Sequence, residues 1–207
     1  MTNTQKLIGY LSKKLDSVYQ IYASFENNLI ENTISLTNSG LSEKDIGRAY
    51  HQIEYIEGNL FRQAMLIMVC SYLEEAMDLI GEAVISEYPA KISKKTKENW
   101  FEKRKKFFEE AGVSFKEIKD QCERINDLLV VRNCIVHSGG RIDKYRYPAQ
   151  VEEAVERLKE RDKDRNVNLV EITVDKFLYL GDDLVVTAII SSKEIISQCS
   201  KTTSGKE

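Results

Sequence analysis

The fold class is decided by one stretch of the sequence, Ala64-Met65-Leu66-Ile67-Met68-Val69-Cys70, which is apolar on every side of a helix. A helix of this kind is normally covered all round by other helices. We therefore expect it at the centre of a helical bundle, within a helix of about residues 43–88 that can break near Gly58. Ser42, with Asp45 three residues later, can cap the start of this helix.

Another long helix is predicted just before it, over about residues 4–37. Its apolar residues follow one another at alternating spacings of three and four, which is the period of a helix packing along a helical neighbour. These residues are Ile8, Leu11, Leu15, Val18, Tyr22, Phe25 and Leu29. Gly40 is suited to the left-handed conformation that commonly follows a helix end.

The rest of the chain adds shorter elements, and helical periodicity gives way to β-rich sequence near residue 169. We expect a third helix that ends at Gly112, a fourth from Ser114 to about residue 138, a fifth over about residues 149–162, a β-hairpin over residues 169–180 and a last helix over about residues 182–199. The expected fold class is all-α, a helical bundle with a small C-terminal β-hairpin and a final helix. We expect a single domain over residues 1–207, with the bundle in 1–165 and the hairpin plus last helix in 166–200.

The composition is that of a globular protein, since 42% of the 207 residues are hydrophobic and 30% are charged. A formal net charge of -3 excludes a uniformly basic nucleic-acid-binding protein but is compatible with a local basic patch. The first residues lack the apolar core of a signal peptide, and no apolar run approaches the ~20 residues that cross a bilayer. We therefore expect a cytoplasmic protein with no membrane partner. The cysteines form no C-x-x-C pair and are expected as buried, reduced thiols: Cys70, Cys122, Cys134 and Cys199.

Arg132 breaks the apolar pattern of the fourth predicted helix, where it stands between Leu129 and Val136. A lone buried charge is costly, so Arg132 must be paired or must line a cavity. His137 stands at the helix end, and Asn133 lies one turn earlier on the same side. Arginine can hold a phosphate through two hydrogen bonds, and histidine can move a proton near neutrality. This set of side chains suits phosphodiester chemistry.

The segment Arg132-Asn133-Cys134-Ile135-Val136-His137 resembles the R-(polar)-x-x-x-H signature of HEPN domains. Gly139 and Gly140 follow the histidine, as is typical of the family. The long helix that carries Ser71-Tyr72-Leu73-Glu74 is also similar to that family, and the layout resembles that of stand-alone bacterial HEPN proteins over about residues 1–165. The resemblance implies a helical bundle with its functional motif on a late helix.

Many HEPN proteins are metal-independent endoribonucleases, in which a ribose 2′-hydroxyl attacks the adjacent phosphate and leaves a cyclic phosphate end. They act as toxins or phage-defence effectors, usually as dimers that place two motifs face to face. The resemblance implies that His137 is the acid or base, Arg132 the phosphate clamp and Asn133 a positioning group. The only other histidine, His51, lies in no motif, so a cleft with two catalytic histidines requires two chains. The implied partners are RNA, a second copy of the chain and an antitoxin or defence-system protein, and no cofactor is implied.

A basic run with interleaved aromatic residues, Lys91 to Lys106, is a further candidate for RNA binding, although a solvated helix face is the alternative. The residues that we expect to contact RNA are Lys103, Arg104, Lys105, Lys106 and Arg141. Glu74 and Glu75 are candidates for supporting the site, or for a plain salt bridge with Arg132.

Two other functions stay open. The chain can be a catalytically inactive HEPN module that binds RNA or a protein partner, or a structural helical dimer. The sequence has no H-x-x-x-H, C-x-x-C or EF-hand spacing, so no metal site is predicted. It also lacks the glycine-rich phosphate loops of nucleotide-binding enzymes, which argues against an NTPase.

Overall fold

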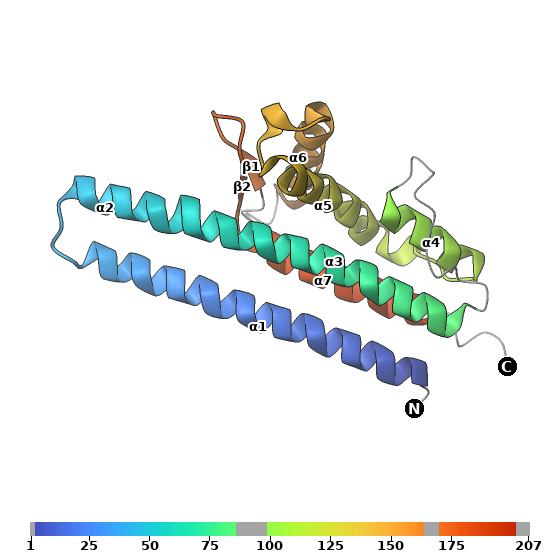
Figure 1. The fold of residues 1–207 in the computed structure, drawn as a ribbon. Helices are drawn as coiled ribbons and strands as arrows, with labels where there is room; N and C mark the ends of the chain where they lie inside the picture. The colour runs from blue at the N-terminus through green and yellow to red at the C-terminus, as the bar shows by residue number, and fades with distance from the viewer. Residues whose placement is uncertain (1–2, 86–98, 164–169, 202–207) are drawn as a thin grey trace.

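The computed structural model describes residues 3–85, 99–163 and 170–201, which form an all-α protein with one small β-hairpin (Figure 1). The expected fold class is confirmed. The α-helices are α1 (Asn3–Thr37), α2 (Glu43–Tyr50), α3 (Asn59–Val84), α4 (Trp100–Glu110), α5 (Lys119–Ser138), α6 (Pro148–Asp162) and α7 (Asp182–Cys199). The other elements are η1 (His51–Gly58), η2 (Lys116–Ile118), η3 (Ile142–Lys144), β1 (Val170–Ile172) and β2 (Leu178–Leu180). None of the described helices has the length and apolarity of a membrane span.

Two predicted segments fall partly or wholly outside this description. The second predicted helix was expected to reach about residue 88, whereas α3 ends at Val84 and residues 86–88 lie outside the described ranges. The first half of the basic run, residues 91–98, also lies outside them.

The α1 helix packs along a rod formed by α2, η1 and α3 (Figure 1). Its predicted apolar seam is confirmed, since four of the expected residues are buried: Leu11, Leu15, Tyr22 and Leu29. The connection between α1 and α2 is also as expected. Gly40 has a φ of 71°, in the left-handed region, and the Ser42 hydroxyl accepts a hydrogen bond from the Asp45 backbone N–H.

The expected break near Gly58 takes the form of the π-helical segment η1, which joins α2 to α3 without interrupting the rod. Gly58 is buried at its end, and a Cβ atom there would lie 3.1 Å from Leu29 Cδ1 of α1. The missing side chain therefore lets α1 approach the rod closely. Segments of π-helix are rare in proteins. Where they occur, they often lie near functional or strained positions.

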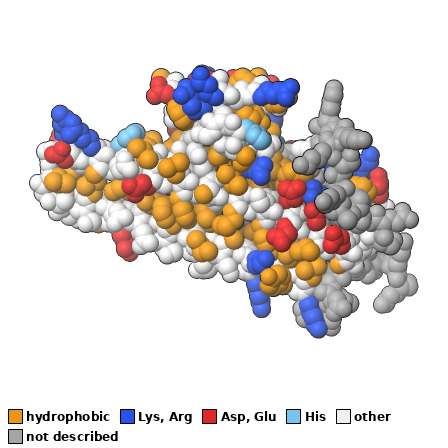
Figure 2. Space-filling view, in the orientation of Figure 1, with side chains coloured by type: hydrophobic (Ala, Val, Ile, Leu, Met, Phe, Trp, Pro, Cys, Tyr) orange, Lys and Arg blue, Asp and Glu red, His pale blue; other side chains and the backbone are white. Residues whose placement is uncertain are grey.

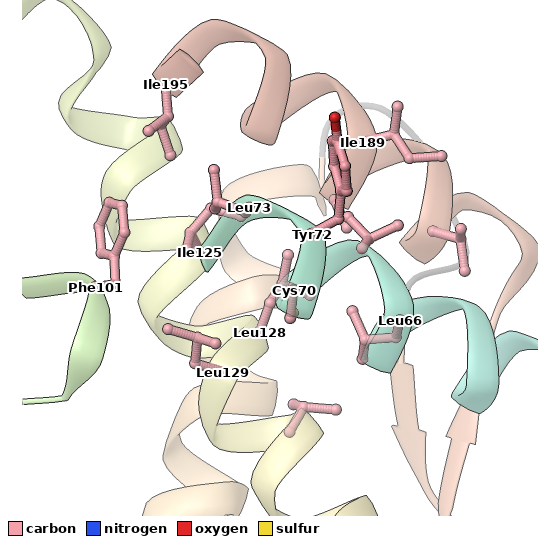
Figure 3. Packing of buried hydrophobic residues seen from close by; sticks show 14 of the residues in the cluster. Leu66, Cys70, Tyr72, Leu73, Phe101, Ile125, Leu128, Leu129, Ile189 and Ile195 are labelled. Atoms are coloured by element: carbon pink, nitrogen blue, oxygen red, sulfur yellow. The ribbon is translucent and has the colours of Figure 1, made fainter. Parts of the chain in front are cut away.

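The α3 helix is the centre of the core, as its apolar middle predicts. Figure 3 shows Leu66, Cys70 and Leu73 among side chains that come from α5 and α7. These residues are 2% exposed or less. Burying a leucine or phenylalanine side chain stabilises the fold by roughly 1.5–3 kcal/mol, so this helix contributes a large share of the stability.

One part of the α3 prediction is wrong for the single chain, because the helix is not covered all round. Four apolar residues on one side of it are exposed, with Leu60 at 60% and Met68 at 39%. This exposed α3 edge consists of Leu60, Ala64, Met68 and Leu79. No described element of the chain packs over these side chains, so a covering surface must come from elsewhere if they are to be buried.

The last helix, α7, belongs to the same core as the helices before residue 165. It packs against α1, α3 and α5, and Figure 1 shows it running alongside α3. Its inward side carries Leu184, Val185, Ala188, Ile189, Ile195, Ile196 and Cys199, all 2% exposed or less. Tyr22 of α1 donates a hydrogen bond to the Asp182 carbonyl at the start of α7. The final helix is therefore a structural part of the bundle.

The fourth predicted helix begins later than expected. It was expected to start at Ser114, but the α-helix α5 starts at Lys119, after the 3₁₀ turn η2. Phe115 is only 3% exposed, and Ile118 has φ of -118° and ψ of 31°, outside the helical region. The Phe115 side chain is buried at the start of this turn, and tertiary packing here outweighs the local preference for a helix.

The β-hairpin is shorter than expected and is attached to the start of α3. Its antiparallel register pairs Val170 with Leu180. The Asn59 side chain donates to the Leu178 carbonyl at 3.2 Å and accepts from the Leu180 N–H at 2.9 Å. Since Leu178 and Leu180 are fully buried, the hairpin packs as part of the core and does not project freely into solvent.

A polar network centred on Arg62 joins the hairpin to the long helices. Arg62 is 2% exposed, and its Nε and Nη2 each donate to the Glu26 carboxylate of α1 at 2.8 Å. Its Nη1 donates to Glu54 of η1 at 2.6 Å and to the Tyr179 hydroxyl of β2 at 3.3 Å. We call Arg62, Glu26, Glu54 and Tyr179 the Arg62 network.

The cysteines are buried free thiols, as expected from the sequence. Burial raises the pKa of Cys70 and of Cys122 to about 12, and it raises the pKa of Cys199 well above its usual range. Because the thiolate is the reactive form, we expect the native protein at pH 8 to react with a thiol reagent at least about a hundredfold more slowly than the unfolded chain. Titration with a chromogenic disulfide, with and without denaturant, measures this. Rapid reaction of even one thiol in the native protein would contradict the packing described here.

Candidate active site

The end of α5 places the predicted motif at the surface of the bundle. Gly139, with a φ of 62°, forms the left-handed C-cap, and its N–H donates to the Ile135 carbonyl at 2.8 Å. The Ser138 hydroxyl donates to the Cys134 carbonyl at 2.7 Å, which completes the last turn. His137 lies in this turn and is exposed to solvent. The helix therefore ends where the sequence predicts, with an accessible imidazole.

Arg132 lies on the side of α5 that faces α3. Its Nη1 donates to the Asn133 side-chain oxygen at 3.0 Å. Its positive charge acts on Cys70 of α3, where it opposes the effect of burial on the pKa of the thiol. Arg132 Nε is buried and donates to none of the described residues. A buried donor without an acceptor costs roughly 1–3 kcal/mol, so the described residues leave the hydrogen-bonding capacity of the Arg132 guanidinium partly unused.

The side chains of Arg132, Asn133 and His137 thus share the last two turns of one helix. Asn133 is half-buried and positions the guanidinium through its oxygen, while His137 lies one turn beyond it. A hydrogen bond joins the Arg132 and Asn133 side chains, and His137 lies on the last turn of the same helix. A guanidinium, an amide and an imidazole at this spacing can bind an oxyanion and move a proton beside it.

The predicted salt bridge between Arg132 and an acid of α3 is not formed. Glu74 lies 3.2 Å from Nη2 of Arg104 on α4, and Glu75 is exposed to solvent. Within the described residues no ion pair joins Arg132 to either acid. Glu74 and Glu75 therefore do not neutralise Arg132, although Glu74 stands one turn from Cys70 and close to the site.

The predicted role of Arg104 in RNA binding is wrong. This residue is 6% exposed, donates from Nε to Asp78 at 2.7 Å and lies over the Trp100 ring at 5.2 Å. The guanidinium of Arg104 is thus paired with Asp78 and Glu74 of α3, and these ion pairs hold α4 against α3. Because the Arg104 guanidinium is buried as well as paired with two carboxylates and the Trp100 carbonyl, it has no free edge for a phosphate.

The lysines of the same run have other positions. Lys105 lies 3.3 Å from Glu102, Lys103 is half-buried and Lys106 is exposed. The Asn126 side chain of α5 bonds to Glu102, which places α4 beside the first half of α5. His137 is about 16 Å further along α5 at 1.5 Å per residue. The α4 segment that carries these lysines therefore contacts α5 in the half of the helix away from His137.

The two remaining predicted residues are on the surface. Arg141 follows the motif directly, forms an ion pair with Asp143 at 2.8 Å and lies over the Phe177 ring at 5.1 Å. His51 of η1 is exposed and stacks on Tyr55, with ring centroids 5.4 Å apart. His51 therefore lies on a different helical segment from the motif.

Sequence reasoning missed Cys70 as a neighbour of Arg132, because no local pattern links the two residues. Tyr147 and Phe177 are exposed aromatic residues that the sequence analysis did not single out, although the alternation Tyr145-Arg146-Tyr147 follows the two glycines directly. In the described part of the chain, no cluster of three or more His, Cys, Asp or Glu side chains is arranged to hold a metal ion. No family model matches this chain, and neither a curated protein nor a solved structure shows significant similarity to it.

Proposed function

We propose that this protein is an endoribonuclease of the HEPN type, with its site at the C-terminal end of α5. One observation carries the proposal: Arg132 is half-buried with an Nε that lacks an acceptor among the described residues, and Asn133 and His137 accompany it on the same helix end. The resemblance of residues 132–137 to the HEPN motif supports the same function.

In this mechanism a ribose 2′-oxygen attacks the adjacent phosphorus while the bond from phosphorus to the 5′-oxygen breaks. The 2′-hydroxyl proton goes to a base, and an acid supplies a proton to the departing 5′-oxygen, so the products are a 2′,3′-cyclic phosphate and a 5′-hydroxyl. His137 acts as acid or base, and Arg132 stabilises the negative charge that develops on the phosphate. Asn133 keeps the guanidinium in position. None of these steps uses a metal ion.

The test is incubation of the purified protein with total cellular RNA in EDTA, beside the Arg132→Ala/His137→Ala double variant. We expect the wild-type protein to cut RNA in chelator and the double variant not to cut it. Binding of RNA without cleavage by the wild-type protein would favour the inactive HEPN module instead. A role as a toxin or phage-defence effector is part of the proposal, and growth arrest on expression that depends on His137 would support it.

The proposal includes a two-fold dimer, because each chain supplies one motif histidine. The exposed α3 edge and Val136 of α5, which is 44% exposed, are apolar surfaces on the two helices that meet at Arg132. In Figure 2, hydrophobic side chains form a band along the long helices on this side of the molecule. Contiguous exposed apolar patches can mark protein interfaces, and a two-fold contact here would bring two α5 ends together.

We expect Met68→Asp to weaken this dimer by at least about tenfold, because an unpaired carboxylate would be buried in the interface. Light scattering over a range of micromolar concentrations measures the change. Ile190→Asp is the matched control, since Ile190 of α7 is also exposed, at 51%, but lies outside the exposed α3 edge. A wild-type protein that is monomeric at every concentration, or equal effects of the two substitutions, would exclude this interface.

A further inference from the structure

The connection between α5 and α6 is fixed to the turn of the hairpin. The Gly140 carbonyl accepts from the Leu178 N–H, and the Ile142 N–H donates to the Lys176 carbonyl, both at 2.9 Å. Figure 1 shows this connection and the hairpin turn side by side at the same end of α5. A Cβ atom at Gly140 would lie 3.2 Å from the Gln63 side chain of α3, so the backbone of the connection also packs closely against α3. This is a rigid surface that begins two residues after His137.

Two exposed aromatic rings lie on this surface, each with an arginine over it. Phe177 is 39% exposed and has the Arg141 guanidinium 5.1 Å from its ring centroid. Tyr147 is 44% exposed and has the Arg146 guanidinium at the same distance. Tyr145 meets the Tyr147 ring edge-on, with centroids 6.1 Å apart, and itself packs against the core. Tyr147 is therefore held by a neighbour that is anchored in the bundle.

The charge of this surface differs from that of the whole protein. Residues 139–147 contain the cations Arg141, Lys144 and Arg146 and the acid Asp143, and the hairpin turn adds one acid and one cation, Asp175 and Lys176, whereas the chain as a whole has a formal net charge of -3. Figure 2 shows Lys and Arg side chains on the projecting part of the molecule that contains the α5–α6 connection and the hairpin. Paired aromatic rings and guanidinium groups in a locally basic surface are the features that bind single-stranded nucleic acid.

We propose that Tyr147 and Phe177, with Arg141 and Arg146, form a stacking site for unpaired nucleotides of an RNA strand whose phosphate reaches His137. This inference rests on the proposed endoribonuclease function and adds to it the form of RNA that the site takes. Aromatic rings can stack only on bases that are not already stacked and paired, whereas duplex RNA is contacted mainly through its shape, phosphates and 2′-hydroxyls. Stacking contributes roughly 1–3 kcal/mol per base, so the site selects single strands.

The test measures binding by the full chain to a labelled 2′-O-methyl oligouridine of about ten nucleotides, the size of a typical single-strand site. This probe lacks the attacking hydroxyl and cannot be cleaved by the proposed mechanism. The same strand annealed to its complement is the duplex probe. We expect Tyr147→Leu/Phe177→Leu to weaken single-strand binding at least about tenfold and to change duplex binding little. Tyr10→Leu is the matched control, because Tyr10 is 54% exposed with Lys14 over its ring at 5.1 Å, but lies on α1.

Absence of binding by the wild-type protein, equal affinity for the two probes, or a double variant that binds like the wild type would each overturn the stacking site. Competition by polyglutamate that equals competition by unlabelled oligouridine would also overturn it and would indicate an acidic protein partner. Failure of the enzyme proposal is distinguishable. If the protein binds single strands selectively but does not cleave ordinary RNA, the stacking site is supported and the enzyme proposal fails. If cleavage depends on His137 but not on Tyr147 and Phe177, the enzyme proposal is supported and the stacking site fails.

Discussion

Replacement of His137 by alanine is expected to lower the rate of RNA cleavage by at least about two orders of magnitude, since one general acid or base typically contributes a factor of 10²–10⁴. The fold should survive, because His137 is exposed on the last turn of α5 and carries little packing. Cleavage assays in EDTA, with product ends identified as cyclic phosphate by mass spectrometry, measure the effect.

The chain offers its own control for that experiment. His51→Ala removes the other histidine, which is also exposed but lies on η1, and it should leave the cleavage rate unchanged. Arg132→Ala should lower the rate as much as His137→Ala, because loss of positive charge at a developing oxyanion has a comparable effect. Normal cleavage by His137→Ala, or activity that disappears in chelator, would disprove the mechanism and leave the binding module as the better explanation.

The second large effect concerns stability and the Arg62 network. Arg62→Met is expected to destabilise the protein by about 3 kcal/mol, because removal of one member of a buried ion pair leaves charge without a partner. For a chain of this size that lowers Tm by about 6–12 °C. Thermal or urea unfolding followed by circular dichroism measures the change. Arg48→Met is the control, since Arg48 is 70% exposed at the side chain and lies 3.7 Å from Asp45 on the surface of α2.

The same network predicts a dependence on pH. Burial raises the pKa of Glu54, but the hydrogen bonds from Arg62 and Tyr179 and the charge of Arg62 more than offset it, so the pKa lies below its ordinary value of 4.5. The stabilisation from Glu54 is therefore fully present above that value and is lost as the pH falls through the lower folded-state pKa. We expect the loss of stability between neutral and acid pH to be larger in the wild-type protein than in Arg62→Met. An equal acid dependence of the two proteins would show that Arg62 does not set the ionisation of Glu54.

The sequence by itself predicted the elements whose signals are local. The three-four spacing from Leu11 to Leu29 gave α1, and the cap at Ser42 and the left-handed Gly40 set the connection to α2. Residues 132–137 were placed correctly on the last turns of α5, because two glycines directly after a helical pattern are a local signal for the end of a helix. Such features depend on backbone hydrogen bonds and caps within a few positions, so no tertiary contact is needed to infer them.

Tertiary structure alone decided how the charged and apolar side chains are used. Arg104 and Lys106 belong to one basic run, yet Arg104 is buried because Asp78 and Glu74 of α3 lie opposite it, while Lys106 is in solvent. The charge of Arg132 acts on Cys70 of α3, and the Arg62 network joins α1 to β2. The exposed edge of α3 has the same apolar residue types as its buried sides. Periodicity records that a side chain is apolar or charged, but the partner that it meets depends on which distant segment packs there, and that is fixed only when the helices assemble.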